Sequence, residues 1–177
     1  MIQIKNAAEL QKMRKACAIS AAALKAGGEA IEPGITTAEI DKIIYDFIVR
    51  HGARPNFLHL YGFPATACIS VNDTVIHGIP NRQQQIRPGD IVSIDTGCKI
   101  DGFNGDNACT YACGKIDLEA QRLLDVTKES LHRGIEMACG GNRVGDIGHA
   151  VQSYVEENGF SVVRTFVGHG VGKELHE

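Results

Sequence analysis

An internal repeat, displaced by 107 residues, restricts the fold of this chain more than any other feature of its sequence. Each copy is a turn followed by a helix with apolar residues at i, i+4, i+7 and i+8, and each helix stops at a glycine. The repeat predicts two related halves, each built as helix, turn, helix and then strands. The matching positions are Pro33-Gly34, Glu39-Ile40, Ile44, Phe47-Ile48 and Gly52 in the first copy, and Gly140-Gly141, Asp146-Ile147, Val151, Tyr154-Val155 and Gly159 in the second.

The ends of these helices follow from the residues that flank them. Thr36 or Thr37 can cap the first helix, because a hydroxyl oxygen accepts from a free backbone N–H of the first turn. Gly52 and Gly159 stand where the chain needs a left-handed residue after a helix. A longer helix, whose apolar face must pack against another element, precedes each turn, at residues 7–30 and 118–138.

The composition is that of a globular protein, and its charge argues against nucleic acid as a partner. Hydrophobic residues make up 44% of the 177 residues and charged residues 22%, which excludes a disordered tail and a fibre. The formal net charge is −3, and no block of basic residues offers a surface for a phosphate backbone. The sequence therefore predicts no direct nucleic-acid recognition.

Neither a membrane span nor a secretion signal is expected. No apolar run approaches the length of roughly eighteen residues that a transmembrane helix needs. Charged residues are spread through positions 1–15, where a signal peptide would be apolar. The six cysteines form no Cys-x-x-Cys pair, so we expect reduced thiols rather than disulfides or a zinc ribbon. These features predict a cytoplasmic protein without a membrane partner.

The second copy of the repeat is followed by much less chain than the first. Residues 53–113 of the first copy are strand-like before helices resume, whereas only residues 160–177 follow the second. We expect a strand at 160–167 and a single domain truncated at its C-terminus. Such a fragment would have repeat halves at 1–113 and 114–177.

The most informative polar segment surrounds Asp101-Gly102, which lies between two strand-like runs and is a strong hairpin signal. With these two residues as the turn, Asp95 lies opposite Ala108 and Asp106 opposite Gly97. Both carboxylates then share one face, about 7–8 Å apart between Cα atoms. A three-residue loop would reverse this arrangement unless a bulge restored it.

Two ionised carboxylates on adjacent strands repel each other, and a divalent cation between them reverses the sign of the interaction. The alternative, two solvated surface aspartates, stays open at this point. His77, expected at the end of a strand that begins near Cys68, and His169, which lies between two glycines, could add an imidazole. Nitrogen ligands suit Mn, Fe, Co or Zn better than Ca or Mg, and His169 is the better candidate.

Four segments, in this order, resemble the type I, bacterial-type methionine aminopeptidases, a metallopeptidase family with the pita-bread fold. The resemblance covers essentially the whole chain. It implies an α+β fold in which two pseudo-symmetric helix-helix-strand halves surround a curved antiparallel sheet, here with the second half incomplete. The segments are Cys68 to Pro80, Gly89 to Asp95, Asp101 to Asp106, and Gly159 to Arg164 continuing into Gly168-His169-Gly170-Val171-Gly172.

The resemblance also implies roles for single residues. Asp95 corresponds to a ligand of one metal ion, Asp106 to the ligand that bridges two ions, and His169 to a ligand of the other. His77 and His176 correspond to catalytic histidines that contact the substrate. The methionine pocket corresponds to Phe63 and Cys68, with Leu60, Leu175 and Phe57 at neighbouring positions where well-known members carry other residue types.

From the family we expect removal of the initiator methionine from nascent proteins. Two divalent ions, of Co, Mn, Fe or Zn, would hold a hydroxide that attacks the first peptide bond. The histidines would hydrogen-bond the substrate and the tetrahedral intermediate. The expected partners are N-terminal methionine peptides of nascent chains and the ribosome, and the full-length enzyme is expected to be a monomer.

One departure from the family bears on activity. Both glutamate ligands of the family would lie beyond Glu177, which leaves Asp95, Asp106 and His169. We therefore expect the 177-residue polypeptide alone to bind the metal pair poorly and to be weakly active or inactive. The alternatives are a proline-directed relative such as prolidase or aminopeptidase P, which normally carries a long N-terminal domain, and a non-catalytic pita-bread module that binds peptides. Loss of the three ligands would have favoured that module, and all three are present.

Overall fold

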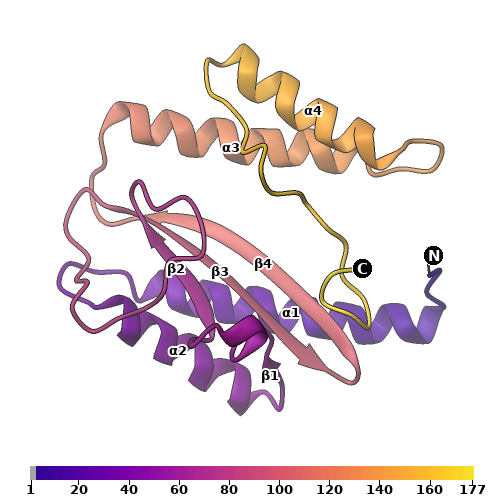
Figure 1. Cartoon of the computed structure of the whole chain (residues 1–177), viewed down its shortest axis with the longest axis horizontal. Helices are drawn as coiled ribbons and strands as arrows, with labels where there is room; N and C mark the ends of the chain where they lie inside the picture. Colours follow the sequence, from indigo (N-terminus) through magenta and orange to yellow (C-terminus); the bar gives the residue numbers. More distant parts are fainter. Residues whose placement is uncertain (1–2) are drawn as a thin grey trace. The chain divides into compact units, whose positions relative to one another are not determined.

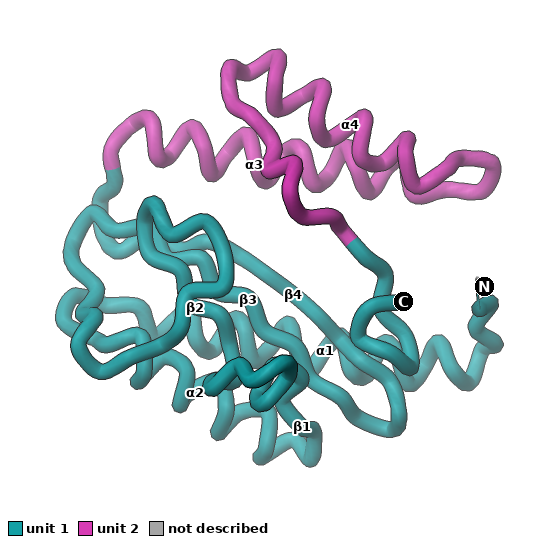
Figure 2. The backbone as a smooth tube through the Cα atoms, viewed as in Figure 1, with its two compact units in different colours: residues 1–116, 169–177 teal, residues 117–168 magenta. Residues whose placement is uncertain are grey.

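The computed structural model describes residues 3–177 and divides into two compact units, coloured separately in Figure 2. Unit 1 comprises Met1–Ile116 together with His169–Glu177, and unit 2 comprises Asp117–Gly168. Among the described residues, no helix combines the length and the apolar character needed to cross a membrane. Every residue that the sequence proposes for the site belongs to unit 1.

The two helices of unit 1 have the ends that the sequence predicts. α1 spans Ala7–Glu29 and α2 spans Thr37–Arg50. At α2, the Glu39 N–H donates to the Thr36 hydroxyl at 3.2 Å and the Thr36 N–H donates to the Glu39 carboxylate at 2.9 Å. This capping box satisfies donors that the first turn leaves free. Gly52, with φ +72, follows the last turn, so the predicted cap and stop are confirmed.

Four strands of unit 1 form one antiparallel sheet around β3 (Figure 1). β3 (Ile91–Ile100) pairs along its whole length with β4 (Phe103–Ala112). It also pairs with β2 (Ala67–Val71) and, nearer its end, with the two-residue β1 (Arg54–Pro55). A short 3-10 turn, η1, covers Leu60–Gly62 between β1 and β2. The predicted α+β class and antiparallel sheet are confirmed.

The hydrophobic core of unit 1 brings together residues of its helices and its sheet. Ile40, Ile44 and Ile48 lie one turn apart along α2, and each is fully buried. Val92 and Ile94 belong to the same core and are also fully buried. Burying a side chain of this size contributes about 1.5–3 kcal/mol. Because Val92 and Ile94 must face this core, the intervening residues of β3 face the other way.

Gly105 lets α1 approach β4 at the position next to Asp106. A Cβ atom built on Gly105 would lie 2.5 Å from the carbonyl oxygen of Ala16 and 2.7 Å from the backbone nitrogen of Cys17, both in α1. Backbone atoms cannot rotate away as the end of a side chain can, so the position requires glycine. The contact fixes how closely the helix packs on the strand.

Unit 2 contains two helices joined by a turn. α3 spans Leu118–Glu136, and α4 spans Val144–Glu157. α4 has 14 residues, as α2 has, and begins 107 positions after it. Gly34 and Gly141, which precede these two helices, both have φ +97. The turn and helix of unit 2 therefore repeat those of unit 1 in local structure.

Two expectations about strands are wrong. Residues 160–167 form an irregular segment instead of a strand, and β2 ends at Val71, so His77 lies in a loop. β2 ends because Asn72 turns the chain with φ +54. A strand also needs a neighbour for its backbone hydrogen bonds, and no described strand pairs with residues 160–167. An apolar pattern by itself does not supply that neighbour.

Replacing Gly105 with alanine should lower the free energy of unfolding by about 1–3 kcal/mol, because the added methyl group must displace the backbone of α1 or β4. Gly148→Ala is the matched control, since Gly148 lies in α4 and a Cβ there would meet no atom within 4 Å. That change should be neutral or stabilise the protein by about 0.5–1 kcal/mol. Urea denaturation followed by circular dichroism measures both. Equal effects would contradict the close helix packing.

Candidate metal centre

The hairpin places the two predicted carboxylates on one face of the sheet. Asp101-Gly102 forms the turn, with both residues at positive φ. The register is the predicted one, with Asp95 opposite Ala108 and Asp106 opposite Gly97. Because side chains alternate along a strand, both carboxylates lie on the face turned away from the hydrophobic core.

Asp95 and Asp106 interact directly in a partly buried position. Burial raises the pKa of Asp95 to about 7, and repulsion from Asp106 acts in the same direction. Burial also raises the pKa of Asp106, although His169 and a hydrogen bond from Asp95 act against that rise. The pair therefore retains a proton on Asp95 at a pH where an isolated aspartate would be ionised. A divalent cation can take the place of that proton.

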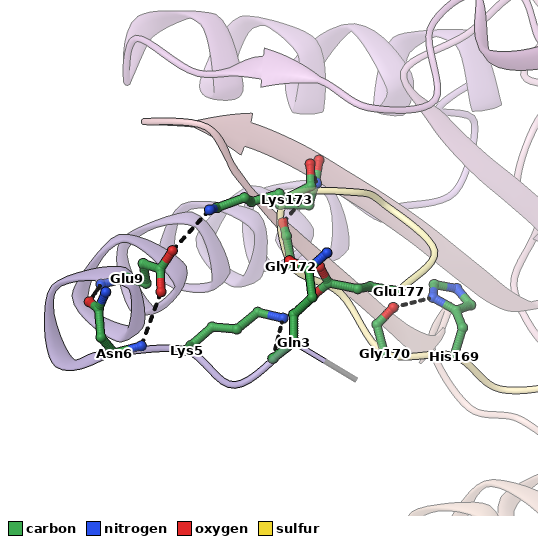
Figure 3. Close-up of polar contacts among 10 residues, drawn as sticks. Gln3, Lys5, Asn6, Glu9, His169, Gly170, Gly172, Lys173 and Glu177 are labelled. Atoms are coloured by element: carbon green, nitrogen blue, oxygen red, sulfur yellow. Dashed lines mark hydrogen bonds and ion pairs between the residues drawn. The ribbon is translucent and has the colours of Figure 1, made fainter. Parts of the chain in front are cut away.

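His169 and His176 come from the loop of residues 168–177, which reaches the carboxylates. Nε2 of His169 lies 3.8 Å from Oδ2 of Asp106. Nδ1 of His169 lies 3.0 Å from the carbonyl oxygen of Gly170 (Figure 3). A carbonyl only accepts, so Nδ1 is the donor in this contact, and Nε2 is the nitrogen that faces Asp106. The ring of His176 meets that of His169 edge to face, with centroids 4.5 Å apart.

The three side chains are of the types that bind divalent transition metals, but they do not surround a metal position. Two carboxylates and a neutral imidazole are ligands that Mn, Fe, Co and Zn accept. Within residues 3–177, no three His, Cys, Asp or Glu side chains converge closely enough to enclose a metal ion. The side chain of Asp106 is 18% exposed and that of His169 is 35% exposed. Asp95, Asp106 and His169 therefore approach one another without enclosing a metal position.

His77, the other candidate catalytic histidine, lies in a loop that is hydrogen-bonded to β2. Its φ of +57 falls in the left-handed region that few residues other than glycine adopt. The Ile69 N–H donates to the Gly78 carbonyl at 2.9 Å, and the Gly78 N–H donates to the Ser70 hydroxyl at 3.0 Å. These bonds hold the backbone beside His77. The two candidate histidines, His77 and His176, therefore come from segments far apart in the sequence.

Three of the candidate pocket residues, Cys68, Leu60 and Leu175, lie at two different places. Cys68 pairs with Asp95 in register, so both side chains lie on the same face of the sheet. Burial raises the pKa of the Cys68 thiol to about 12, which keeps the thiol neutral. Leu60 and Leu175 line a separate cavity of about 380 Å³ that neither Phe63 nor Cys68 lines. The structure therefore brings Leu60 and Leu175 together, and it brings Cys68 toward the carboxylates.

Asp41 of α2 supports the segment that leads into β2, a role that sequence reasoning missed. Its Oδ1 accepts from the N–H of Thr66 at 2.9 Å and from the N–H of Ala67 at 2.8 Å. Burial raises the pKa of Asp41, and these two bonds act against that rise. No local pattern could have revealed this role, because the partners lie 25 and 26 residues away in the chain.

Comparisons with known proteins point to one family. The model of metallopeptidase family M24 matches residues 11–177. A methionine aminopeptidase of Clostridium perfringens is 51% identical over 177 residues, which cover 100% of this chain and 71% of that protein. Methionine aminopeptidase 1 of Bacillus subtilis is 46% identical with the same coverage. The crystal structure of methionine aminopeptidase from Rickettsia prowazekii, 38% identical, matches with a TM-score of 0.97 over 100% of this chain and 71% of that chain. The expected pita-bread fold is confirmed.

Without metal, the buried pair of Asp95 and Asp106 should make the free energy of unfolding fall as pH rises. The folded-state pKa of Asp95, about 7, lies above its ordinary value of 3.8, so the folded protein binds the extra proton and loses that advantage as pH rises through about 7. Asp95→Asn removes the effect. In buffer with EDTA, this variant should match the wild type near about pH 4 and exceed its free energy of unfolding at about pH 8 by on the order of 1–3 kcal/mol.

Urea denaturation at a series of pH values measures this difference. Asp101→Asn, at the exposed turn of the same hairpin, controls for the loss of one negative charge. A stability difference between Asp95→Asn and the wild type that did not grow with pH would show that the two carboxylates do not share a buried proton.

Proposed function

Because the chain belongs to metallopeptidase family M24 and, within it, to the methionine aminopeptidases, we propose that its site removes the N-terminal methionine from nascent proteins. The observation that carries the proposal is the approach of Asp95, Asp106 and His169 on one face of the β3–β4 hairpin. The 51% identity to a protein named methionine aminopeptidase favours this substrate over the proline-directed alternatives.

Asp95, Asp106 and His169 would hold the metal. Asp106 interacts with both of the others, so it would lie at the centre of the set of residues that holds the metal. Two divalent cations of Mn, Fe, Co or Zn would supply a nucleophile at neutral pH and polarise the carbonyl of the first peptide bond. The contribution of the chain itself is electrostatic, because its buried carboxylates favour a cation over the proton that they otherwise share.

His77 and His176 would bind and orient the substrate. His176 lies against the ring of His169, next to the proposed ligands, and His77 is presented by a loop whose backbone is bonded to β2. Ring N–H groups of the two histidines could donate to the scissile carbonyl and to the negative charge that develops on its oxygen. Fixed donors of this kind need no reorganisation when that charge appears.

The methionine side chain would be bound by apolar groups beside the carboxylates. Cys68 is buried on that face with a neutral thiol, and Phe63 would add an aromatic surface. Leu60 and Leu175, which line the separate cavity, would contact the substrate there. Such a surface suits an unbranched thioether and penalises a charged side chain, which would lose its hydration. Action on nascent chains would place the protein in the cytoplasm and beside the ribosome. The full-length enzyme would be a monomer.

Asp106→Asn should weaken the binding of Co(II) at least about tenfold, because loss of a ligand costs no less than the loss of a group that merely orients one. Asp101→Asn is the matched control, since Asp101 is an exposed residue of the same hairpin that pairs with Lys15 at 2.7 Å. It should retain the wild-type affinity. Titration followed by the visible absorption of bound Co(II) gives both constants. Equal affinities for wild type and Asp106→Asn would refute the metal assignment.

The polypeptide of residues 1–177, assayed alone, should release methionine slowly, because among its described residues no three His, Cys, Asp or Glu side chains converge closely enough to enclose a metal ion. The assay measures free methionine from a Met-Ala-Ser peptide with added Mn, Fe or Co. Residual release should require metal, disappear in Asp106→Asn and be absent with an Ala-Pro-Ser peptide. Rapid turnover of Met-Ala-Ser would contradict the expected weak activity, and preferential cleavage of Ala-Pro-Ser would contradict the substrate assignment.

A further inference from the structure

Asn104 is the most deeply buried polar side chain on the face of the hairpin that carries the carboxylates. It lies on β4 two residues before Asp106, so both side chains point to the same face. Only 2% of its surface is exposed. A primary amide buried to this extent needs hydrogen-bond partners, because it has given up its bonds to water.

The partners of Asn104 lie in a single loop. Its Nδ2 donates to the carbonyl oxygen of Gly172 at 2.9 Å and to that of Lys173 at 3.0 Å. Its backbone N–H donates to the Gly172 carbonyl as well, at 2.9 Å. Gly172 lies three residues after His169, and Lys173 lies three residues before His176. Asn104 therefore binds the loop at Gly172 and Lys173, halfway along the chain between His169 and His176.

Besides these bonds and the contact of His169 with Asp106, this loop is connected to the rest of unit 1 by long, flexible lysine side chains. The Lys173 ammonium that pairs with Glu9 is 55% exposed, and pairs of that kind are screened by water and cost side-chain entropy. The Asn104 amide is shorter, more rigid and out of water. The lysine ties, two of which Figure 3 shows, are Lys173 to Glu9, Lys5 to Glu177, and Lys99 to the backbone oxygen of Lys173.

We propose that Asn104 is a positioning residue, which fixes the loop of residues 168–177 so that His169 and His176 stand beside Asp106. The importance of this position rests on the function proposed above. Two residues along a strand span about 6.8 Å, so β4 itself sets the distance between the loop anchor and the carboxylate. Asn104 acts only through the loop.

The geometry of the anchor accounts for the residue type. The NH₂ group of asparagine offers two donors from one nitrogen, which matches two consecutive carbonyl oxygens. Leucine has the same number and branching of side-chain heavy atoms, although it is bulkier, and it has no donor. Aspartate has a similar shape, but at neutral pH it would turn only acceptors toward those oxygens.

Amide hydrogen exchange of the 177-residue chain, measured by NMR in EDTA, tests the proposal. The Gly172 N–H, bonded to Glu174 at 3.0 Å, and the Glu177 N–H, bonded to Gly170 at 2.9 Å, report on the loop. In Asn104→Leu, both should exchange about tenfold faster or more, while amides of β3 change less than about twofold. The ring protons of His169 and His176, shifted by their edge-to-face contact, should move toward the values of free histidine.

Thr96→Val is the matched control. Thr96 is fully buried on the neighbouring strand, and its hydroxyl has no hydrogen-bond partner, so this change alters a buried polar residue without breaking a side-chain bond. It should leave the loop amides and the histidine signals at their wild-type values. Wild-type loop exchange in Asn104→Leu, or equal acceleration in Thr96→Val, would overturn the proposal.

If Asn104→Leu loses the protected amides of β3 and is thus unfolded, Asn104→Asp takes its place at neutral pH. The same local acceleration in this variant supports the anchor, and wild-type loop exchange overturns it. Both readouts work without metal or peptide. A negative result would therefore reject the positioning role alone, whereas the Co(II) and methionine-release measurements decide the proposed function.

Discussion

The two-residue turn at Asp101-Gly102 is the constraint on which the rest of the site depends. Because both residues adopt positive φ, β3 and β4 pair in one register along ten residues each. A slip of one residue would send one of the two carboxylates to the opposite face. The same register directs Gly105 toward α1 and leaves Asn104 and Asp106 on the polar face. Along residues 104–106, Gly105 therefore packs against α1, while Asn104 and Asp106 face the candidate metal centre.

The two faces of the hairpin impose opposite requirements. On one, Val92 and Ile94 are fully buried in the core, and α1 touches the backbone at Gly105. This packing on one face allows the other face to carry two carboxylates, and burial, together with repulsion from Asp106, raises the pKa of Asp95 to about 7. The free energy gained by burying the core therefore offsets the unfavourable proximity of Asp95 and Asp106. A bound cation would reduce the repulsion between these two carboxylates.

Features set by local rules were predictable from the sequence. The cap at Thr36, the stop at Gly52 and the hairpin register follow from residues close together in the chain, and all three are confirmed. Features that need a distant partner were not predictable. The segment 160–167 has a strand-like pattern but no described neighbour. The anchoring bonds of Asn104 reach 68 and 69 residues along the chain, where no periodicity can indicate them.

The spacing of the site residues along the chain also bears on how the site assembles. Asp95 and Asp106 are separated by 11 positions, whereas 63 positions separate Asp106 from His169. Closing the longer loop costs about 1.5 kcal/mol more in chain entropy than closing the shorter one. Hairpins also form within microseconds, before distant segments dock. We therefore expect the acidic pair to form before His169 reaches it, and a cation bound at that stage would favour the approach of the histidine.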